Sequence, residues 1–331
     1  MRQGIFRRND NGILTAAAVL VAVLAACSLF TGRYPLKLSA LFGGDPLQRK
    51  VFFLLRAGRT VTSVLGGAVL GAAGYTYQTV FKNPLASPDV AGVSSGAGAG
   101  AAAGLLLFGR TGAVTASAFA GALAAAAAVT GITALDRERR SGTIVLAGIA
   151  VHSLAQTLLT LLKLTSDPER ELASIEYWLM GSLIGVSSDS IGINMAICAA
   201  ALAAMCLLHR QTLLLSLEDG EAEMLGVNVS RMRLITLLIA TLAVSSVISL
   251  TGIISFVGLI APHFARLLIR GNSRKTLFLS SLSGAAVLTG ADILARCVTD
   301  AELPVSIFTS LIGAPLLIRL ALKKRAGSDI R

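Results

Sequence analysis

Charged residues are scarce in this chain of 331 residues: Asp, Glu, Lys and Arg make up 14% of it, whereas 54% is hydrophobic. A soluble globular domain carries about 25% charged residues, because its surface faces water. The scarcity therefore excludes a soluble globule and indicates a polytopic membrane protein. The apolar runs are uninterrupted and do not alternate over segments of about ten residues, which excludes a transmembrane β-barrel.

Motifs for nucleotide or metal chemistry are missing as well. The chain has no G-x-x-x-x-G-K-[ST] sequence that could cradle nucleotide phosphates, and no H-E-x-x-H zinc motif. Its three histidines are far apart without paired acids, and its four cysteines have no spacing typical of a metal site or a disulfide framework. We therefore expect no active site, no metal and no cofactor. His152, inside an apolar run, is either a pathway residue or a helix-packing residue.

Aromatic residues make up only 5% of the chain, while glycine and alanine are abundant. Small residues let helix backbones approach one another closely in lipid, and Gly67 and Gly71 have the small-xxx-small spacing of such a contact. The net charge of +11 comes from basic residues spread over short loops and chain ends. This distribution indicates membrane topology and excludes a nucleic-acid partner.

The apolar runs predict about ten transmembrane helices in a single domain that covers residues 1–331. Ser87, Pro88 and Asp89 predict the start of the third helix, because they supply a cap, an N1 proline and an acid in the first turn. The eighth run is short and contains Pro262, so it predicts a partial or tilted helix. The runs are 13–30, 60–80, a third ending near 108, 113–135, 143–164, 189–208, 234–250, 256–269, 276–295 and 305–322.

An even number of spans places both termini on one side, and the charges indicate that this side is the cytoplasm. Cytoplasmic loops carry an excess of Lys and Arg. Basic residues fall on the side of the termini at five places: the N-terminus, Arg137/Arg139/Arg140, Arg231/Arg233, Arg270/Arg274/Lys275 and Lys323 to Arg325. The acidic loops 165–177 and 300–302 fall on the other side. The first loop is an exception, with four basic residues outside: Arg49, Lys50, Arg56 and Arg59.

One polar interval, residues 213–233, is long enough to fold between two spans. Its pattern predicts two short helices separated by Glu218-Asp219-Gly220, with Ala222, Met224 and Leu225 available to one face of the second. Gly226 stands where a helix C′ residue would, and Asn228 or Ser230 can cap the helix that follows. An apolar protrusion with a charged rim suits docking into a groove of a soluble partner. The alternative is an ordinary solvated loop.

Four stretches together resemble the permease subunits of ABC importers for iron chelates (siderophores), haem and cobalamin, the FecCD type of type II importer. They cover nearly the whole chain at the right spacing: NPLASPDVAGVSSGA (83–97), LEDGEAEMLGVNVSRMR (217–233), TGIISFVGLIAPHFARLL (251–268) and GADILAR (290–296). The resemblance implies an all-α permease similar to that of the cobalamin importer, in the bacterial plasma (inner) membrane. It also implies that the chain is not itself an enzyme.

The resemblance assigns roles to particular residues. Glu221, Ala222, Leu225 and Gly226 match the coupling signature that docks on the ATPase subunit. Arginines on the outer face of the family receive acidic residues of the substrate-binding protein, which would explain the exceptional basic loop. The residues that match them are Arg56, Arg59 and Arg296. Gly58 departs from the family, which has a proline before the second arginine, so the local turn is expected to be looser. The alternative role of these arginines is to anchor helix ends at lipid headgroups.

The resemblance also implies the assembly: two permeases, identical or paralogous, two ATPases and an extracytoplasmic substrate-binding protein in the lipid bilayer. A wide pathway would run between the permeases, with Tyr75, Tyr77, Gln78, Ser94 and Ser95 as candidate gate and wall residues or, alternatively, as plain helix-packing residues. We expect transport of a ferric siderophore, with haem or cobalamin as alternatives. An ion-coupled secondary transporter would need buried acids, and the confident spans contain only Asp292.

Overall fold

The computed structural model describes residues 10–32, 34, 46–89, 92–135, 141–184 and 188–326. Six helical stretches in these ranges are long and apolar enough to cross a membrane: α1 (Asp10–Phe30), α2 (Pro46–Lys50) continued through the π-helix η2 (Val51–Ala57) into α3 (Gly58–Val80), α5 (Thr111–Leu135), α6 (Ser141–Thr165), α11 (Val229–Thr251) and α13 (Arg274–Cys297). Four further helices carry shorter apolar stretches: α4 (Val93–Phe108), α8 (Ser188–Leu207, apolar over Ile191–Leu207), α12 (Val257–Leu268) and α14 (Val305–Ala326, apolar over Val305–Arg319). The predicted all-α fold with about ten transmembrane helices is confirmed.

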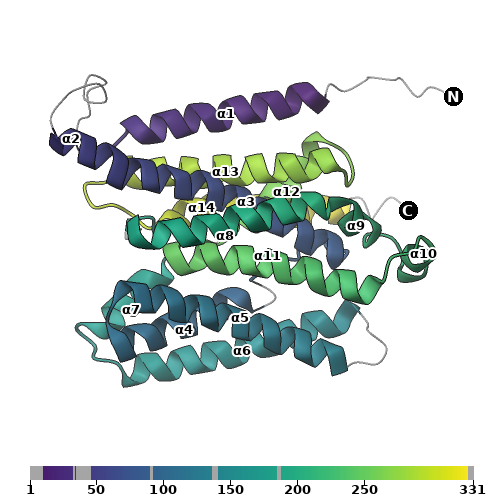
Figure 1. Ribbon diagram of the computed structural model, residues 1–331, viewed down its shortest axis with the longest axis horizontal. Coiled ribbons are helices and arrows are strands. Elements are labelled where there is room, and N and C mark those ends of the chain that lie inside the picture. Colours follow the sequence, from purple (N-terminus) through teal and green to yellow (C-terminus); the bar gives the residue numbers. More distant parts are fainter. Residues whose placement is uncertain are drawn as a thin grey trace.

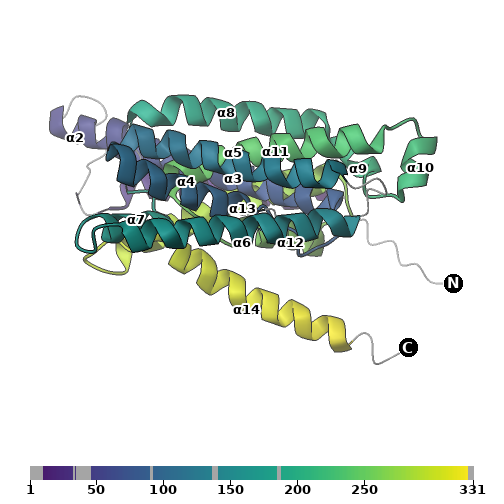
Figure 2. The ribbon, with the colours of Figure 1, turned by 90° about the horizontal axis from the view of Figure 1, so that it is seen from below.

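The long helices run roughly side by side along the long axis of the molecule (Figure 1). The helix α3 lies in the middle and packs against α8, α11, α12 and α13, while α4, α5 and α6 form a group beyond α11. Turning the molecule shows α8 and α14 on opposite sides of the bundle (Figure 2). Three short helices join the long ones at the two ends: α7 (Glu171–Leu179), α9 (His209–Leu214) and α10 (Asp219–Met224).

Small residues let α3 and α13 pack in direct backbone contact, as the sequence predicts. A Cβ atom added to Gly67 would lie 2.5 Å from the Gly284 carbonyl oxygen, and one added to Gly71 would lie 2.1 Å from the Ser280 carbonyl oxygen. Neither distance is sterically tolerable, so only glycine fits at these two positions. Close approach of this kind gives helices in lipid the van der Waals contact that holds them together.

The start of α4 differs from the prediction. The helix begins at Val93, after Gly92 in the left-handed conformation (φ +75°), whereas the sequence predicted a start at Ser87 to Asp89. Residues 88 and 89 form a turn instead, in which the Gly92 N–H donates to the Asp89 carbonyl at 3.1 Å. The Asp89 carboxylate accepts a hydrogen bond from the Ser94 hydroxyl and so does not cap an earlier helical turn.

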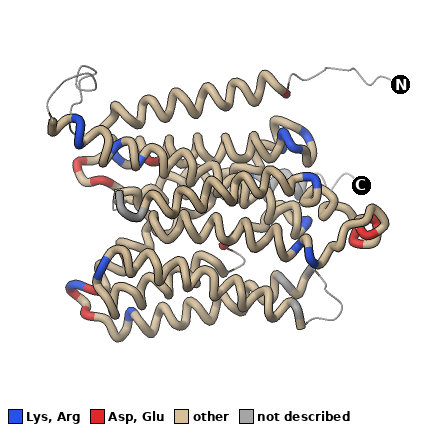
Figure 3. The backbone as a smooth tube through the Cα atoms, viewed as in Figure 1, with Lys and Arg blue, Asp and Glu red and all other residues tan. Residues whose placement is uncertain are grey.

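Charges gather at the two ends of the bundle (Figure 3). The helix α1 begins and α14 ends at the end that carries α10 (Figures 1 and 2). Basic residues at this end surround the acids of α10, whereas basic and acidic residues are mixed at the other end (Figure 3). Residues 1–9 and the predicted charged loop 136–140 lie outside the described ranges.

Candidate functional site

The polar interval 213–233 contains the short helix α10, framed by α9 before it and α11 after it. Two short helices were predicted here, but both begin earlier than expected, at His209 and Asp219. The second begins at Asp219 because Glu218 is extended (φ −62°, ψ 147°), so Gly220 lies in the first helical turn and does not separate the helices. The predicted break extended through Gly220, so the predicted start of the second helix is two residues too late.

The end of α10 follows the predicted pattern. Gly226 has φ +82°, which L side chains rarely adopt, and the Val227 N–H donates back to the Ala222 carbonyl at 3.2 Å. This arrangement satisfies a carbonyl at the helix end that would otherwise lack a partner. The Asn228 side chain then caps α11 by accepting from the Arg231 N–H at 3.0 Å. The chain thus turns sharply between α10 and α11.

The turn leaves an apolar tip on the surface, which we call the coupling tip (Met224 and Leu225). The exposed fractions are 89% for Met224 and 61% for Leu225, and Glu221, Glu223 and Gly226 beside them are also exposed. Ala222 is instead fully buried. The prediction that it shares one available face with Met224 and Leu225 is therefore wrong. The Ala222 methyl group joins the main hydrophobic core and anchors α10.

An ion-paired cluster fixes α10 to the bundle, and we call it the Asp219 clamp (Lys82, Asp219 and Arg233). The Asp219 carboxylate accepts from Lys82 Nζ at 3.0 Å and from Arg233 Nη2 at 3.0 Å. Lys82 lies two residues beyond the end of α3, and Arg233 lies in the first turns of α11. The clamp thereby links the coupling tip to two helices of the bundle centre. No local sequence pattern predicts this clamp, because Lys82 and Arg233 are separated from Asp219 by 137 and 14 residues.

The charge of Asp219 persists at neutral pH. Partial burial alone would raise the pKa of its carboxyl, but the hydrogen bond from Lys82 and the charge of Arg233 outweigh burial and lower that pKa. A carboxyl whose pKa is lowered by folding stabilises the fold above its unfolded pKa, and this stabilisation disappears as the pH falls through the lowered value. The clamp is therefore intact at physiological pH and opens only in acid.

Replacement of Asp219 by asparagine should loosen α10 without unfolding the bundle. The carboxylate is 46% exposed, so solvent screening limits the loss of global stability to about 1 kcal/mol or less. Hydrogen exchange should become faster at the amides of α10 but not at those of α13. Glu223→Gln, an exposed acid on the same helix outside the clamp, serves as the control and should leave both rates unchanged. Equal exchange in Asp219→Asn and wild type would show that the clamp does not hold α10.

The three arginines predicted to dock a binding protein lie at the opposite end and make internal contacts. Arg59 donates to Asp292 and Glu302, at 2.8 Å each. Arg296 contacts the Asp292 carboxylate at 2.8 Å, while Arg56 donates to the carbonyls of Leu29, Phe30 and Tyr34. Each arginine is largely buried, so an internal role is visible for all of them. Their docking role stays a prediction.

The five predicted gate and wall residues are buried inside the subunit. The Tyr77 hydroxyl shares a hydrogen bond of 2.6 Å with Thr241, and Gln78 accepts from Arg266 and donates to the Leu259 carbonyl at 3.2 Å. Arg266 also lies 5.5 Å from the ring centre of Tyr75. Ser94 bonds Asp89, and Ser95 donates to the Gly92 carbonyl at 3.0 Å. These contacts show helix packing, and the gate role stays a prediction.

A polar face lies on α6, and His152 is the one member of it that was singled out from the sequence. Five exposed polar residues lie close together in the middle of this mainly apolar helix, and we call them the α6 polar face: His152, Ser153, Gln156, Thr157 and Thr160. The signal was present in the 3–4-residue spacing of these residues, but only His152 was considered. Polar groups in a membrane helix normally face the protein interior or a water-filled space. The hydroxyls of Ser153, Thr157 and Thr160 donate to carbonyls of their own helix at 2.8–2.9 Å, whereas His152 and Gln156 present polar groups on the surface of the subunit.

Taken together, the spanning helices define a polytopic membrane protein, with the coupling tip exposed at one end of its bundle. The comparison with known sequences agrees and gives the family. Residues 19–323 match the FecCD transport family, so the chain belongs to this family. Its members are membrane permease components of ABC transporters, as the four sequence motifs implied.

Several relatives cover most of the chain. The molybdate import permease MolB of Haemophilus influenzae is 32% identical, covering 95% of this chain and 96% of MolB. The cobalamin import permease BtuC of Halobacterium salinarum is 35% identical, and the match covers 84% of this chain and 75% of BtuC. A solved structure, described as an inward-facing metal-chelate type ABC transporter, has a TM-score of 0.86 and 32% identity. The match covers 95% of this chain and 99% of that one. Other relatives are named as permeases for Fe(3+)-citrate, ferric enterobactin and hemin.

Proposed function

We propose that the chain is the permease subunit of an ATP-driven importer and that the coupling tip docks on a separate ATPase subunit. The observation that carries the proposal is the attachment of this tip. Met224 and Leu225 are exposed where a groove could receive them, while Ala222 and the Asp219 clamp tie the same short helix to α3 and α11. A movement of the ATPase would thus reach the bundle centre. ATP binding would then shift the population between inward-facing and outward-facing states.

The proposed assembly contains two permeases, two ATPases and an extracytoplasmic binding protein. Glu221, Ala222, Leu225 and Gly226 would form the coupling site, with Ala222 acting as its buried anchor. The end that carries α10 would face the cytoplasm of a bacterial cell, because basic residues surround α10 and because α1 begins and α14 ends there. Arg56, Arg59 and Arg296 would then lie at the outer face, where they could orient the binding protein.

For the substrate we propose a ferric siderophore, with haem, cobalamin or molybdate as alternatives taken from the relatives. Support comes from the relatives named for ferric enterobactin and Fe(3+)-citrate and from the chelate transporter of similar structure. An ion-coupled secondary transporter is disfavoured by the environment of Asp292. This fully buried acid lies between Arg59 and Arg296, each 2.8 Å away, so it is already neutralised.

The α6 polar face is proposed to line the pathway between two permeases, while Tyr75, Tyr77, Gln78, Ser94 and Ser95 would act on the gate from inside each subunit. Gln156→Leu should therefore reduce uptake several-fold, because it removes a hydrogen-bonding group from a polar path, without loss of ATPase association. Ser153→Ala provides a milder change on the same face. The matched control is Leu158→Ala, which alters an exposed apolar residue of α6. Equal uptake by Gln156→Leu and wild type would exclude a pathway role for Gln156.

The function is tested by purifying the tagged chain in mild detergent and identifying the proteins that copurify with it. An ATPase should copurify, and vesicles containing the complex and its binding protein should take up the substrate only with ATP. Uptake is measured for a ferric siderophore, haem, cobalamin and molybdate in parallel, so that the substrate is assigned independently of the importer mechanism. A folded chain that purifies without an ATPase and without ATPase activity would contradict the importer proposal.

A further inference from the structure

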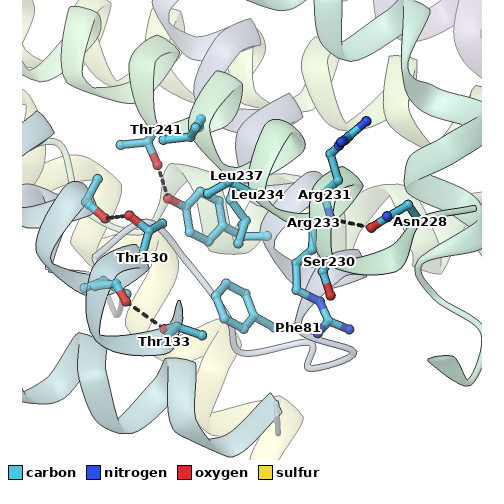
Figure 4. Close-up of a pocket in the computed structure, with 14 residues that line it drawn as sticks. Phe81, Thr130, Thr133, Asn228, Ser230, Arg231, Arg233, Leu234, Leu237 and Thr241 are labelled. Carbon is cyan, nitrogen blue, oxygen red and sulfur yellow. Dashed lines mark hydrogen bonds between the residues drawn. The ribbon is translucent and has the colours of Figure 1, made fainter. Parts of the chain in front are cut away.

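A cavity of about 450 Å³ lies between α5 and α11, beside the end of α3 (Figure 4). It is separate from the coupling tip and from the α6 polar face. Apolar side chains from all three helices or their ends contribute to its walls, among them Phe81, Val129, Leu234, Leu237 and Leu238. Leu234 and Leu238 are each 43% exposed, so the cavity opens beside residues at the bundle surface.

The hydroxyl groups around the cavity have partners within the protein. Thr130 donates to the Ala126 carbonyl at 2.8 Å, and Thr133 donates to the Val129 carbonyl at 2.7 Å, each within its own helix. Thr241, which Figure 4 shows on another side of the cavity, shares a hydrogen bond with the Tyr77 hydroxyl. Because these groups are satisfied, the walls present mainly methyl, methylene and aromatic surface. Such a cavity suits a hydrocarbon chain better than a polar chelate.

One side of the cavity is cationic. Arg231 and Arg233 line it there together with Asn228 and Ser230, opposite the threonines (Figure 4). Arg231 is exposed, whereas Arg233 is only 7% exposed. Arg233 Nη2 contacts Asp219, but its buried Nε has no hydrogen-bond partner among the residues that the structure describes. A buried donor without an acceptor is unfavourable, so this atom calls for an acceptor from outside the described chain.

We propose that an anionic phospholipid occupies this cavity, with an acyl chain against α5 and α11 and its phosphate at Arg231 and Arg233. A phosphate at this side of the cavity would neutralise the charge of Arg231, which Asp219 does not contact. It would lie beside the Arg233 guanidinium, whose buried Nε reaches a phosphate oxygen once that side chain turns toward the cavity. Lipid is the surrounding solvent at an opening between spanning helices, and basic pockets between such helices at the cytoplasmic side suit acidic headgroups. Because Arg233 also belongs to the Asp219 clamp, the bound lipid would contact the anchor of the coupling tip.

The test is native mass spectrometry of the purified full chain, titrated with phosphatidylglycerol or with phosphatidylcholine of the same acyl chains. Phosphatidylglycerol should bind at least about fivefold more tightly than phosphatidylcholine. Arg231→Gln should abolish most of this preference for phosphatidylglycerol. Arg233→Gln should weaken binding further, while Thr130→Trp should weaken binding of both lipids by filling the cavity. Arg270→Gln, an exposed arginine in the α12–α13 loop, is the matched control and should bind like wild type. Inorganic phosphate alone should not compete.

Several outcomes would overturn the proposal, and none depends on transport or on an ATPase. Equal binding of the two lipids, or equal binding by Arg231→Gln and Arg270→Gln, would exclude a specific anionic site. If Thr130→Trp dissociates a dimer but leaves lipid binding intact, a second copy of the chain, and not a lipid, covers the cavity. Competition by inorganic phosphate would assign the arginines to a free anion. Arg231 is exposed, so its replacement gives an answer even if Arg233→Gln fails to fold.

Discussion

A Gly226→Arg variant is expected to lose its ATPase partner while the permease itself stays folded. Gly226 has φ +82°, and a Cβ atom added to it would meet nothing within 4 Å. The variant would therefore gain only the backbone strain of a non-glycine residue in this conformation, about 1–2 kcal/mol. A long charged side chain beside Met224 and Leu225 would, however, occupy the space that a docked partner needs. Association should weaken at least about 30-fold, which corresponds to about 2 kcal/mol.

The measurement is copurification of the ATPase with the tagged permease, accompanied by thermal unfolding of the permease in detergent. Gly271→Arg is a closely matched control, because Gly271 has φ +88°, also has open surroundings, and lies between α12 and α13 outside the interval 213–233. It should bring the same strain and the same charge but retain the ATPase. Loss of the partner in both variants, or in neither, would contradict docking at the coupling tip.

The sequence predicted the membrane fold well because the signals were local. Long apolar runs set the spanning helices, and most observed helices begin or end within a few residues of the predicted bounds. Gly67 and Gly71 predicted close packing through their spacing alone, and the structure identifies α13 as the partner. The start of α4 was missed, since the capping residues at 87–89 form a turn whose end depends on the left-handed conformation of Gly92.

The candidate site was predicted only where its pattern lies within one segment. The turn at Gly226 and the cap at Asn228 could be inferred because both depend on neighbouring residues. Contacts between distant segments could not be inferred in the same way. Lys82 reaches Asp219 across 137 residues, and Arg59 reaches Asp292 across 233, and no local pattern specifies either pair. Tertiary packing therefore decided which charged residues face solvent and which are paired.

Replacement of Asp292 by alanine is expected to destabilise strongly the end of the bundle opposite α10. The Asp292 side chain has no exposed surface and lies 2.8 Å from both Arg59 and Arg296, whose side chains are 11% and 5% exposed. Its removal would leave two buried guanidinium groups without their shared carboxylate. Breaking a buried ion pair from one side costs about 3–5 kcal/mol. Thermal unfolding in detergent should show a loss of that order, whereas Glu302→Gln, at a residue 26% exposed, should lose about 1 kcal/mol or less.

A double variant separates the ion pair from simple loss of packing. Combining Asp292→Leu with Arg296→Met replaces one pair by apolar groups, and Arg59 keeps Glu302 as a partner at 2.8 Å. Such replacements of buried pairs are often neutral, so the double variant should recover much of the stability that Asp292→Leu alone loses. No recovery would show that Asp292 acts through packing instead. Recovery would show that Asp292 holds Arg296 inside the permease. An acid of the proposed binding protein would then meet a guanidinium group that is already neutralised.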